Sequence, residues 1–148
     1  MTLYVLDTDH ISLLQRRNAH VIARLEHISL DERAVTIITV IEQIQGRLAV
    51  IHHATSEADV ARGCERLQET MGFYASIYVL PYDVEAQLQF AHLRRQQVRI
   101  GTQDLRIAAI ALSKHATLVT RNRRDFAKVP GLHKGGGARY GLHGRRLR

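Results

Sequence analysis

The chain has 148 residues, of which 45% are hydrophobic and 24% are charged, and its formal net charge is +7. This length fits one domain that buries a full core, and the composition is ordinary for a soluble protein. The single cysteine excludes an internal disulfide, and no stretch resembles a signal peptide or is apolar enough to cross a bilayer. We therefore expect a cytoplasmic protein without membrane contact.

The predicted elements alternate between strands and helices along the chain. Apolar runs predict strands at residues 3–6, 34–38, 77–80 and 117–120. Helical spacing and cap signals predict helices at residues 11–17, 19–28, from 39 onwards, 55–76, 83–97 and 103–115. This alternation indicates an α/β fold, with a parallel sheet of four to five strands between two layers of helices.

Three of the predicted helices carry apolar stripes that should face the core. The helix over 103–115 is apolar nearly all round, which predicts a buried helix. In the helix over 83–97, we expect Val84, Leu88 and Ala91 to point inwards. The longest helix, over 55–76, should bury one stripe of residues: Val60, Cys64, Leu67, Met71 and Tyr74.

The positive charge is concentrated near the C-terminus. Residues 133–148 carry five of the seven net positive charges and no acid, which leaves a weakly basic body. This Gly- and Arg-rich segment has too little apolar content to fold on its own. We therefore expect a domain over residues 1–132 and a mobile basic tail over 133–148, which is compatible with a nucleic-acid partner.

Carboxylates follow the strands or begin the helices at several positions. Asp7 comes directly after the first strand, Glu42 follows the second, Asp104 begins the buried helix, and Asp125 follows the fourth strand. Because the carboxyl ends of parallel strands meet at one edge of a sheet, these acids are able to converge. Clustered carboxylates bind a hard divalent cation, and such a site supports phosphodiester hydrolysis.

Each of these acids also has a purely structural interpretation. Thr39 and Glu42 have the spacing of a helix capping box, and this spacing alone favours a cap over a metal ligand. Asp104 lies in a first helical turn, where the helix dipole stabilises any acid. Asp9 fits the N-cap of a helix that begins at Ile11, and Asp125 fits a solvated loop acid.

Four segments resemble the PIN-domain family, and specifically the VapC-type ribonuclease toxins of bacterial toxin–antitoxin pairs. These segments are residues 6–9 (LDTD), 42–46 (EQIQG), 101–109 (GTQDLRIAA) and 118–126 (LVTRNRRDF), followed by VPGL at 129–132. The resemblance implies an α/β/α sandwich, a Mg²⁺ or Mn²⁺ site, and endonucleolytic cleavage of RNA. It also implies that Asp7, Glu42 and Asp104 are the catalytic, metal-binding acids, which overrides the capping interpretation of Glu42.

The chain departs from the family pattern in two places. Where the family often has a fourth acid after the fourth strand, this chain has Asn122, so Asp125 is a candidate to replace it. Thr8 and Thr120 are further candidates for this additional site, and Arg121, Arg123 and Arg124 are candidates for RNA binding. After Leu132 the usual acidic terminal strand is missing, which suggests that an edge strand has been lost.

The resemblance also implies partners. A small antitoxin of the VapB type should inhibit the enzyme by laying a helix in a groove beside the acids, and the toxin should form a homodimer.

Two other functions stay open: a non-catalytic basic module that binds nucleic acid, and a haloacid-dehalogenase phosphatase, whose nucleophile motif resembles residues 7–9. Replacing Asp7 or Asp104 with Asn should relieve like-charge repulsion and leave the fold intact.

Overall fold

The computed structural model describes residues 2–135 and contains one parallel sheet. In chain order its strands are β1 (Tyr4–Leu6), β2 (Arg33–Thr36), β3 (Tyr78–Leu80), β4 (Thr117–Val119) and β5 (His133–Gly135). Their order across the sheet is β3-β2-β1-β4-β5, and every neighbouring pair is parallel. The first strand is therefore central, as its apolar residues predict.

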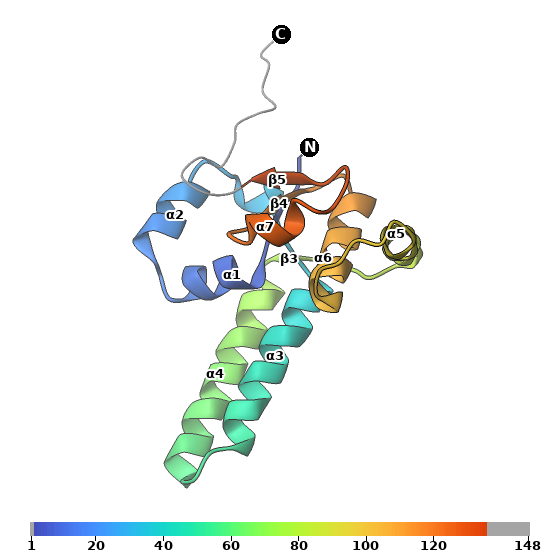
Figure 1. Cartoon of the computed structure of the whole chain (residues 1–148). Coiled ribbons are helices and arrows are strands. Elements are labelled where there is room, and N and C mark those ends of the chain that lie inside the picture. The colour runs from blue at the N-terminus through green and yellow to red at the C-terminus, as the bar shows by residue number, and fades with distance from the viewer. Residues whose placement is uncertain (1, 136–148) are drawn as a thin grey trace.

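The helices cover both faces of this sheet (Figure 1). They are α1 (Thr8–Gln15), α2 (Ala19–Leu25), α3 (Ile37–His52), α4 (Glu57–Ala75), α5 (Val84–Arg95), α6 (Thr102–Ser113) and the short α7 (Arg123–Phe126), with a 3₁₀ turn at Leu30–Glu32. No helix within residues 2–135 is long and apolar enough to span a membrane. This arrangement is the predicted α/β/α sandwich.

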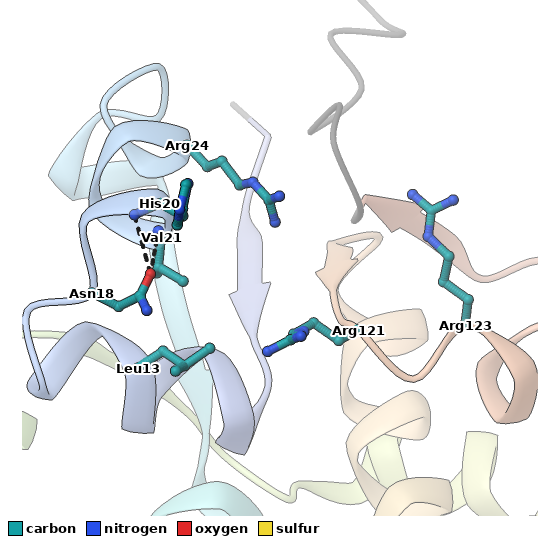
Figure 2. A pocket seen from close by; sticks show the side chains of 7 residues that line it. All are labelled: Leu13, Asn18, His20, Val21, Arg24, Arg121 and Arg123. Carbon is teal, nitrogen blue, oxygen red and sulfur yellow. Dashed lines mark hydrogen bonds between the residues drawn. The ribbon is translucent and has the colours of Figure 1, made fainter.

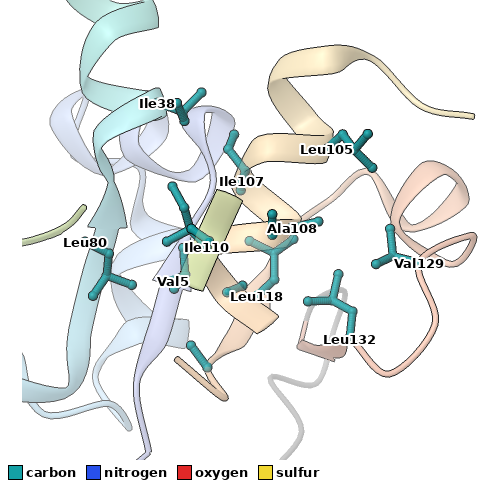
Figure 3. Close-up of a cluster of buried hydrophobic side chains, with 14 of the residues drawn as sticks. Val5, Ile38, Leu80, Leu105, Ile107, Ala108, Ile110, Leu118, Val129 and Leu132 are labelled. Carbon is teal, nitrogen blue, oxygen red and sulfur yellow. The ribbon is translucent and has the colours of Figure 1, made fainter. Parts of the chain in front are cut away.

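The core consists of two apolar clusters, one on each face of the sheet. Val5 of β1 lies in the cluster under α5 and α6, whereas Leu6 lies in the cluster under α1 and α2, because alternate strand residues point to opposite faces. In the first cluster, shown in Figure 3, α6 contributes fully buried side chains such as Ile110. The prediction of a buried helix at this position is confirmed.

The last strand corrects an expectation from the sequence. Residues 133–135 pair with β4 as the edge strand β5, and the Thr120 amide donates to the Gly135 carbonyl at 3.0 Å. The edge strand is therefore present, and the sheet extends three residues past the boundary expected at Leu132. The rest of the expected basic tail, residues 136–148, lies outside the described part of the chain.

The helices α3 and α4 form a long antiparallel hairpin that projects beyond the sheet (Figure 1). Two residues of the stripe predicted for α4 are not in the core, since Cys64 is exposed and Met71 is 58% exposed. Tyr74 is buried as the stripe predicts, but the other buried residues of α4 are Gly63 and Thr70, which lie outside the stripe. Because α4 packs mainly on α3, the close approach of the two helices at Gly63 favours a small residue there over a larger apolar one.

The expected inward face of α5 is also wrong. Val84 and Leu88 are 67% and 65% exposed, whereas Ala86 and Leu93 are buried. The helix begins at Val84, capped by the Asp83 carboxylate, which accepts from the Ala86 amide at 3.0 Å. This start agrees with the expected helix over 83–97, so the error lies in the packing partner: α5 packs mainly on α6, with Ala86 and Leu93 in the shared core.

The close approach of α3 and α4 gives a matched pair of glycine substitutions. A Cβ at Gly63 would lie 2.7 Å from Cγ1 of Ile51, whereas a Cβ at Gly72 in the same helix would meet no atom within 4 Å. Thermal or urea unfolding should show that Gly72→Ala stabilises the protein by about 0.5–1 kcal/mol. Gly63→Ala should destabilise it by about 1 kcal/mol net, because overpacking exceeds the gain in helix propensity. Equal stabilisation by both changes would contradict the tight contact.

Candidate active site

Asp7 lies between the end of β1 and the first turn of α1, where it is almost fully buried. It is the N-cap of α1, and its Oδ1 accepts from the His10 amide at 2.9 Å and from the His10 ring Nδ1 at 2.8 Å. The Thr120 hydroxyl donates a further bond from the end of β4. Burial raises the pKa of Asp7, but the bonds from His10 and Thr120 outweigh it, so that the pKa lies below its usual value.

Glu42 lies in the second turn of α3 and is half-buried. The N-cap of α3 is Thr36, whose Oγ1 accepts from the Thr39 amide at 3.2 Å, so α3 begins two residues before the expected start. The Thr39–Glu42 capping box is therefore wrong, and the Glu42 carboxylate instead accepts from the Thr8 hydroxyl. Burial raises the pKa of Glu42, and the charges of Asp104 and Asp9 raise it further.

Asp104 lies in the first turn of α6, also half-buried. Burial raises its pKa, and the negative charges of Asp125, Asp7 and Asp9 add to this effect. Asp104 therefore interacts electrostatically with two acids: the charge of Asp7 raises the pKa of Asp104, and the charge of Asp104 raises the pKa of Glu42. The three acids expected to bind metal come from distant parts of the sequence, and Asp104 lies close enough to both of the others for their negative charges to interact.

Asp9 is the acid whose place the sequence interpretation missed. Because α1 begins at Thr8 and Asp7 is its N-cap, Asp9 is not a cap but an exposed residue of the first turn. Its charge acts on both Glu42 and Asp104. The signal was present in the sequence, since a helix that starts directly after Asp7 places Asp9 beside the same sheet edge.

The additional site residues after β4 form a small network. The Asn122 amide nitrogen Nδ2 donates to Oδ2 of Asp125 at 3.0 Å, and the Asn122 backbone donates to Oγ1 of Thr120 at 3.0 Å. Asn122 therefore orients Asp125, whose charge faces Asp104 rather than only solvent. Arg121, Arg123 and Arg124 are exposed, on the loop after β4 and on α7.

The chemistry of this donor set is that of a cation site. Asp7, Asp9, Glu42, Asp104 and Asp125 form what we call the carboxylate cluster, with Thr8 and Thr120 as hydroxyl partners. Among residues 2–135, no three His, Cys, Asp or Glu side chains are already grouped closely enough to hold a metal ion. Mg²⁺ fits such a loose cluster, because it retains several waters and takes only one or two carboxylates directly.

The opposite pKa directions of Asp104 and Asp7 predict opposite effects on the stability of the metal-free protein. The raised pKa of Asp104 means that its contribution to stability is fully present below the unfolded pKa and is lost as the pH rises through the folded pKa. At neutral pH in EDTA, Asp104→Asn should therefore raise the Tm, and the gain should vanish in acid.

Asp7→Asn should instead lower the Tm at neutral pH. The lowered pKa of Asp7 means that its ionised form stabilises the fold above the unfolded pKa, and this contribution is lost as the pH falls through the folded pKa. The expectation that both substitutions relieve repulsion is thus corrected for Asp7. Calorimetry across a pH series measures both effects, and a higher Tm for Asp7→Asn would contradict the role of its hydrogen bonds.

The chain is similar to known proteins over most of its length. The tRNA(fMet)-specific endonuclease VapC of Salmonella typhimurium is 28% identical over 138 residues, which cover 89% of this chain and 96% of the relative. Ribonuclease VapC1 of Haemophilus influenzae is 31% identical over 134 residues, covering 88% and 94%.

Solved structures show the same likeness. The DNA-bound VapBC from Salmonella typhimurium matches with a TM-score of 0.69 and 26% identity, over 92% of this chain and 98% of that one. VapBC-1 from Haemophilus influenzae matches with a TM-score of 0.69 and 25% identity, over 91% and 98%. The PIN domain family model matches residues 4–132. The chain therefore belongs to the PIN domain family.

Proposed function

We propose that this PIN domain is a metal-dependent endoribonuclease and the toxin of a toxin–antitoxin pair, acting in the cytoplasm. The observation that carries the proposal is the carboxylate cluster, in which the charge of Asp104 raises the pKa of Glu42 and the charge of Asp7 raises the pKa of Asp104. The names of the relatives, a tRNA-specific endonuclease and a ribonuclease, support RNA as the substrate. Membership of the PIN family leaves no place for the haloacid-dehalogenase alternative.

We assign the catalytic metal, Mg²⁺ with Mn²⁺ as an alternative, to Asp7, Glu42 and Asp104, with Asp125 and Asn122 beside them. When bound, such an ion polarises the phosphoryl oxygen and lowers the pKa of a bound water. The protein's own contribution is orientation. His10 and Thr120 hold the carboxylate of Asp7, and Thr8 holds that of Glu42.

The role of His10 also bears on the products. His10 is fully buried, and its Nδ1 donates to Asp7. It is therefore not placed to remove a proton from a ribose 2′-hydroxyl, the step that would give a cyclic phosphate. We expect attack by water instead, which leaves a 5′-phosphate and a 3′-hydroxyl.

Cleavage assays on RNA test this function directly. The full chain should cut RNA with Mg²⁺ or Mn²⁺ and leave it intact in EDTA, and Asp104→Asn should abolish cleavage because it removes a ligand charge. Asp31→Asn, an exposed acid in the 3₁₀ turn, is the matched control and should retain activity. A non-catalytic binding module would bind RNA equally in EDTA and never cut it, and cyclic-phosphate products would contradict attack by water.

A second part of the proposal concerns the partners of the chain. We propose the homodimer that the resemblance implies, and an antitoxin that binds each toxin. The solved structures are of VapBC assemblies, which supports a VapB-type partner for this chain. Two cavities of about 420 and 230 Å³ share Arg16, Arg47 and Arg66, and together they extend from Thr8, beside Glu42, to Phe73 on α4. Burial lowers the pKa of Arg47, and the charges of Arg66 and Arg16 lower it further, whereas Tyr74 and Glu69 raise it. An acidic partner segment would add to the effect of Glu69 on Arg47.

Co-expression tests this partner. The small protein encoded beside this chain, where one exists, should restore growth to cells that express the toxin, and Arg66→Glu should weaken the rescue because it reverses one charge of the groove. Cells whose growth arrest depends on Asp104 but is not relieved by the neighbouring protein would contradict the antitoxin assignment.

A further inference from the structure

A separate cavity of about 490 Å³ lies on the other side of α1, between α2 and the loop that follows β4. Leu13 of α1 lines it, with four residues from the segment of α2 and two from the segment after β4. In chain order the full lining is Leu13, Asn18, His20, Val21, Arg24, Arg121 and Arg123. Figure 2 shows Arg24 and Arg121 extending towards one another from the two sides of β1, with Arg123 at the rim. We call this cavity the α2 pocket.

The α2 pocket carries positive charge only. Three of its seven lining residues are arginines and none is acidic. Within residues 2–135, no carboxylate lies within ion-pair distance of Arg121 or Arg123. The planar guanidinium donors of arginines that line one cavity suit an anion, above all a phosphate.

The α2 pocket adjoins the carboxylate cluster, because the two share the loop after β4 and the helix α1. Arg121 lies in the chain between Thr120, whose hydroxyl donates to Asp7, and Asn122, which orients Asp125. Leu13 belongs to α1, the helix that Asp7 caps. A nucleic-acid strand whose scissile phosphate lies at the cluster would therefore bring an adjoining nucleotide to this pocket.

The lining is mixed, as a nucleotide requires. Leu13 and Val21 provide apolar surface, and the imidazole of His20 provides a face for stacking. The Oδ1 of Asn18 caps α2 by accepting from the His20 and Val21 amides at 3.1 and 3.2 Å. Since these two bonds fix the side-chain amide, its Nδ2 remains as a positioned donor for a base or a sugar oxygen.

We propose that the α2 pocket binds one nucleotide of single-stranded RNA adjoining the scissile phosphodiester. Its phosphate lies against Arg24, Arg121 and Arg123, and its base lies over Leu13, Val21 and His20 near the amide of Asn18. This inference rests on the proposed function, and it adds a substrate subsite to which α2 contributes. Neither the carboxylates nor the groove between α1, α3 and α4 takes part in it.

The direct test is binding of RNA without cleavage. A short, unstructured, end-labelled RNA of mixed sequence is titrated with the full chain in EDTA and followed by fluorescence anisotropy at several salt concentrations. Arg121→Gln and Arg24→Gln should each weaken binding by about tenfold and reduce the salt slope by about one. Arg95→Gln, which removes an exposed arginine of α5, is the matched control and should bind like the wild type.

A second substitution separates pocket chemistry from folding. Asn18→Asp keeps the helix cap, since Asp and Asn cap equally well, but replaces the amide donor with a carboxylate. It should leave the Tm unchanged and weaken RNA binding. In cleavage assays with metal, the pocket variants should raise KM with little change in kcat, the opposite of the loss expected for Asp104→Asn.

The outcomes distinguish this inference from the proposed function. If the wild type cuts RNA but Arg24→Gln, Arg121→Gln and Asn18→Asp all bind RNA normally, the subsite is wrong and the nuclease stands. If these variants bind RNA normally but lose inhibition by the antitoxin, the pocket serves an acidic protein segment, which also overturns the proposal. If the wild type cuts no RNA with any divalent metal, the proposed function itself fails.

Discussion

Ionised carboxylates packed side by side destabilise a protein unless a cation lies among them, and the arrangement at this sheet edge depends on that constraint. Glu42 and Asp104 each have a pKa raised by burial and by neighbouring negative charge. An apolar or amide side chain at either place would serve the fold better. The negative charges of Glu42 and Asp104 destabilise the metal-free protein, and a bound cation would offset this cost.

The charge of Asp7 is stabilised differently, because hydrogen bonds from the protein itself offset the cost of burying it. Its N-cap position satisfies one amide of α1, while the His10 ring and the Thr120 hydroxyl hold the carboxylate in one orientation. The three acids thus combine one carboxylate that is held in place and favoured in its ionised form with two whose ionised forms are disfavoured. This division is what an open metal site needs: a fixed anchor, and neighbours able to adjust when the cation enters.

The sequence was most informative where burial alone decides structure. The central position of β1 and the burial of α6 follow from apolar residues with no polar alternative. The predictions were wrong where the role of a residue depends on the exact start of a helix or on the helix against which it packs. The helix α1 begins three residues earlier than expected, and α3 begins two residues earlier. These shifts move Asp9 and Glu42 out of the capping positions that the sequence suggested for them.

Contacts between distant segments explain the remaining differences. Gly63 and Thr70 form the buried face of α4 because α3 comes close to them, and no pattern within α4 itself encodes that approach. His133–Gly135 has no strand signature of its own, yet β4 offers an unpaired edge, and pairing with it forms β5. In the same way, the α2 pocket joins arginines nearly a hundred positions apart, which no local motif predicts.

The central claim is that Asp7, Glu42 and Asp104 bind one divalent cation, and calorimetric titration with Mn²⁺ tests it most directly. The metal-free wild type should bind Mn²⁺, and Glu42→Gln should bind it far more weakly, because one ligand charge is gone. Glu65→Gln, an exposed acid of α4, should match the wild type. Equal affinity of Glu42→Gln and the wild type for Mn²⁺ would contradict the assignment.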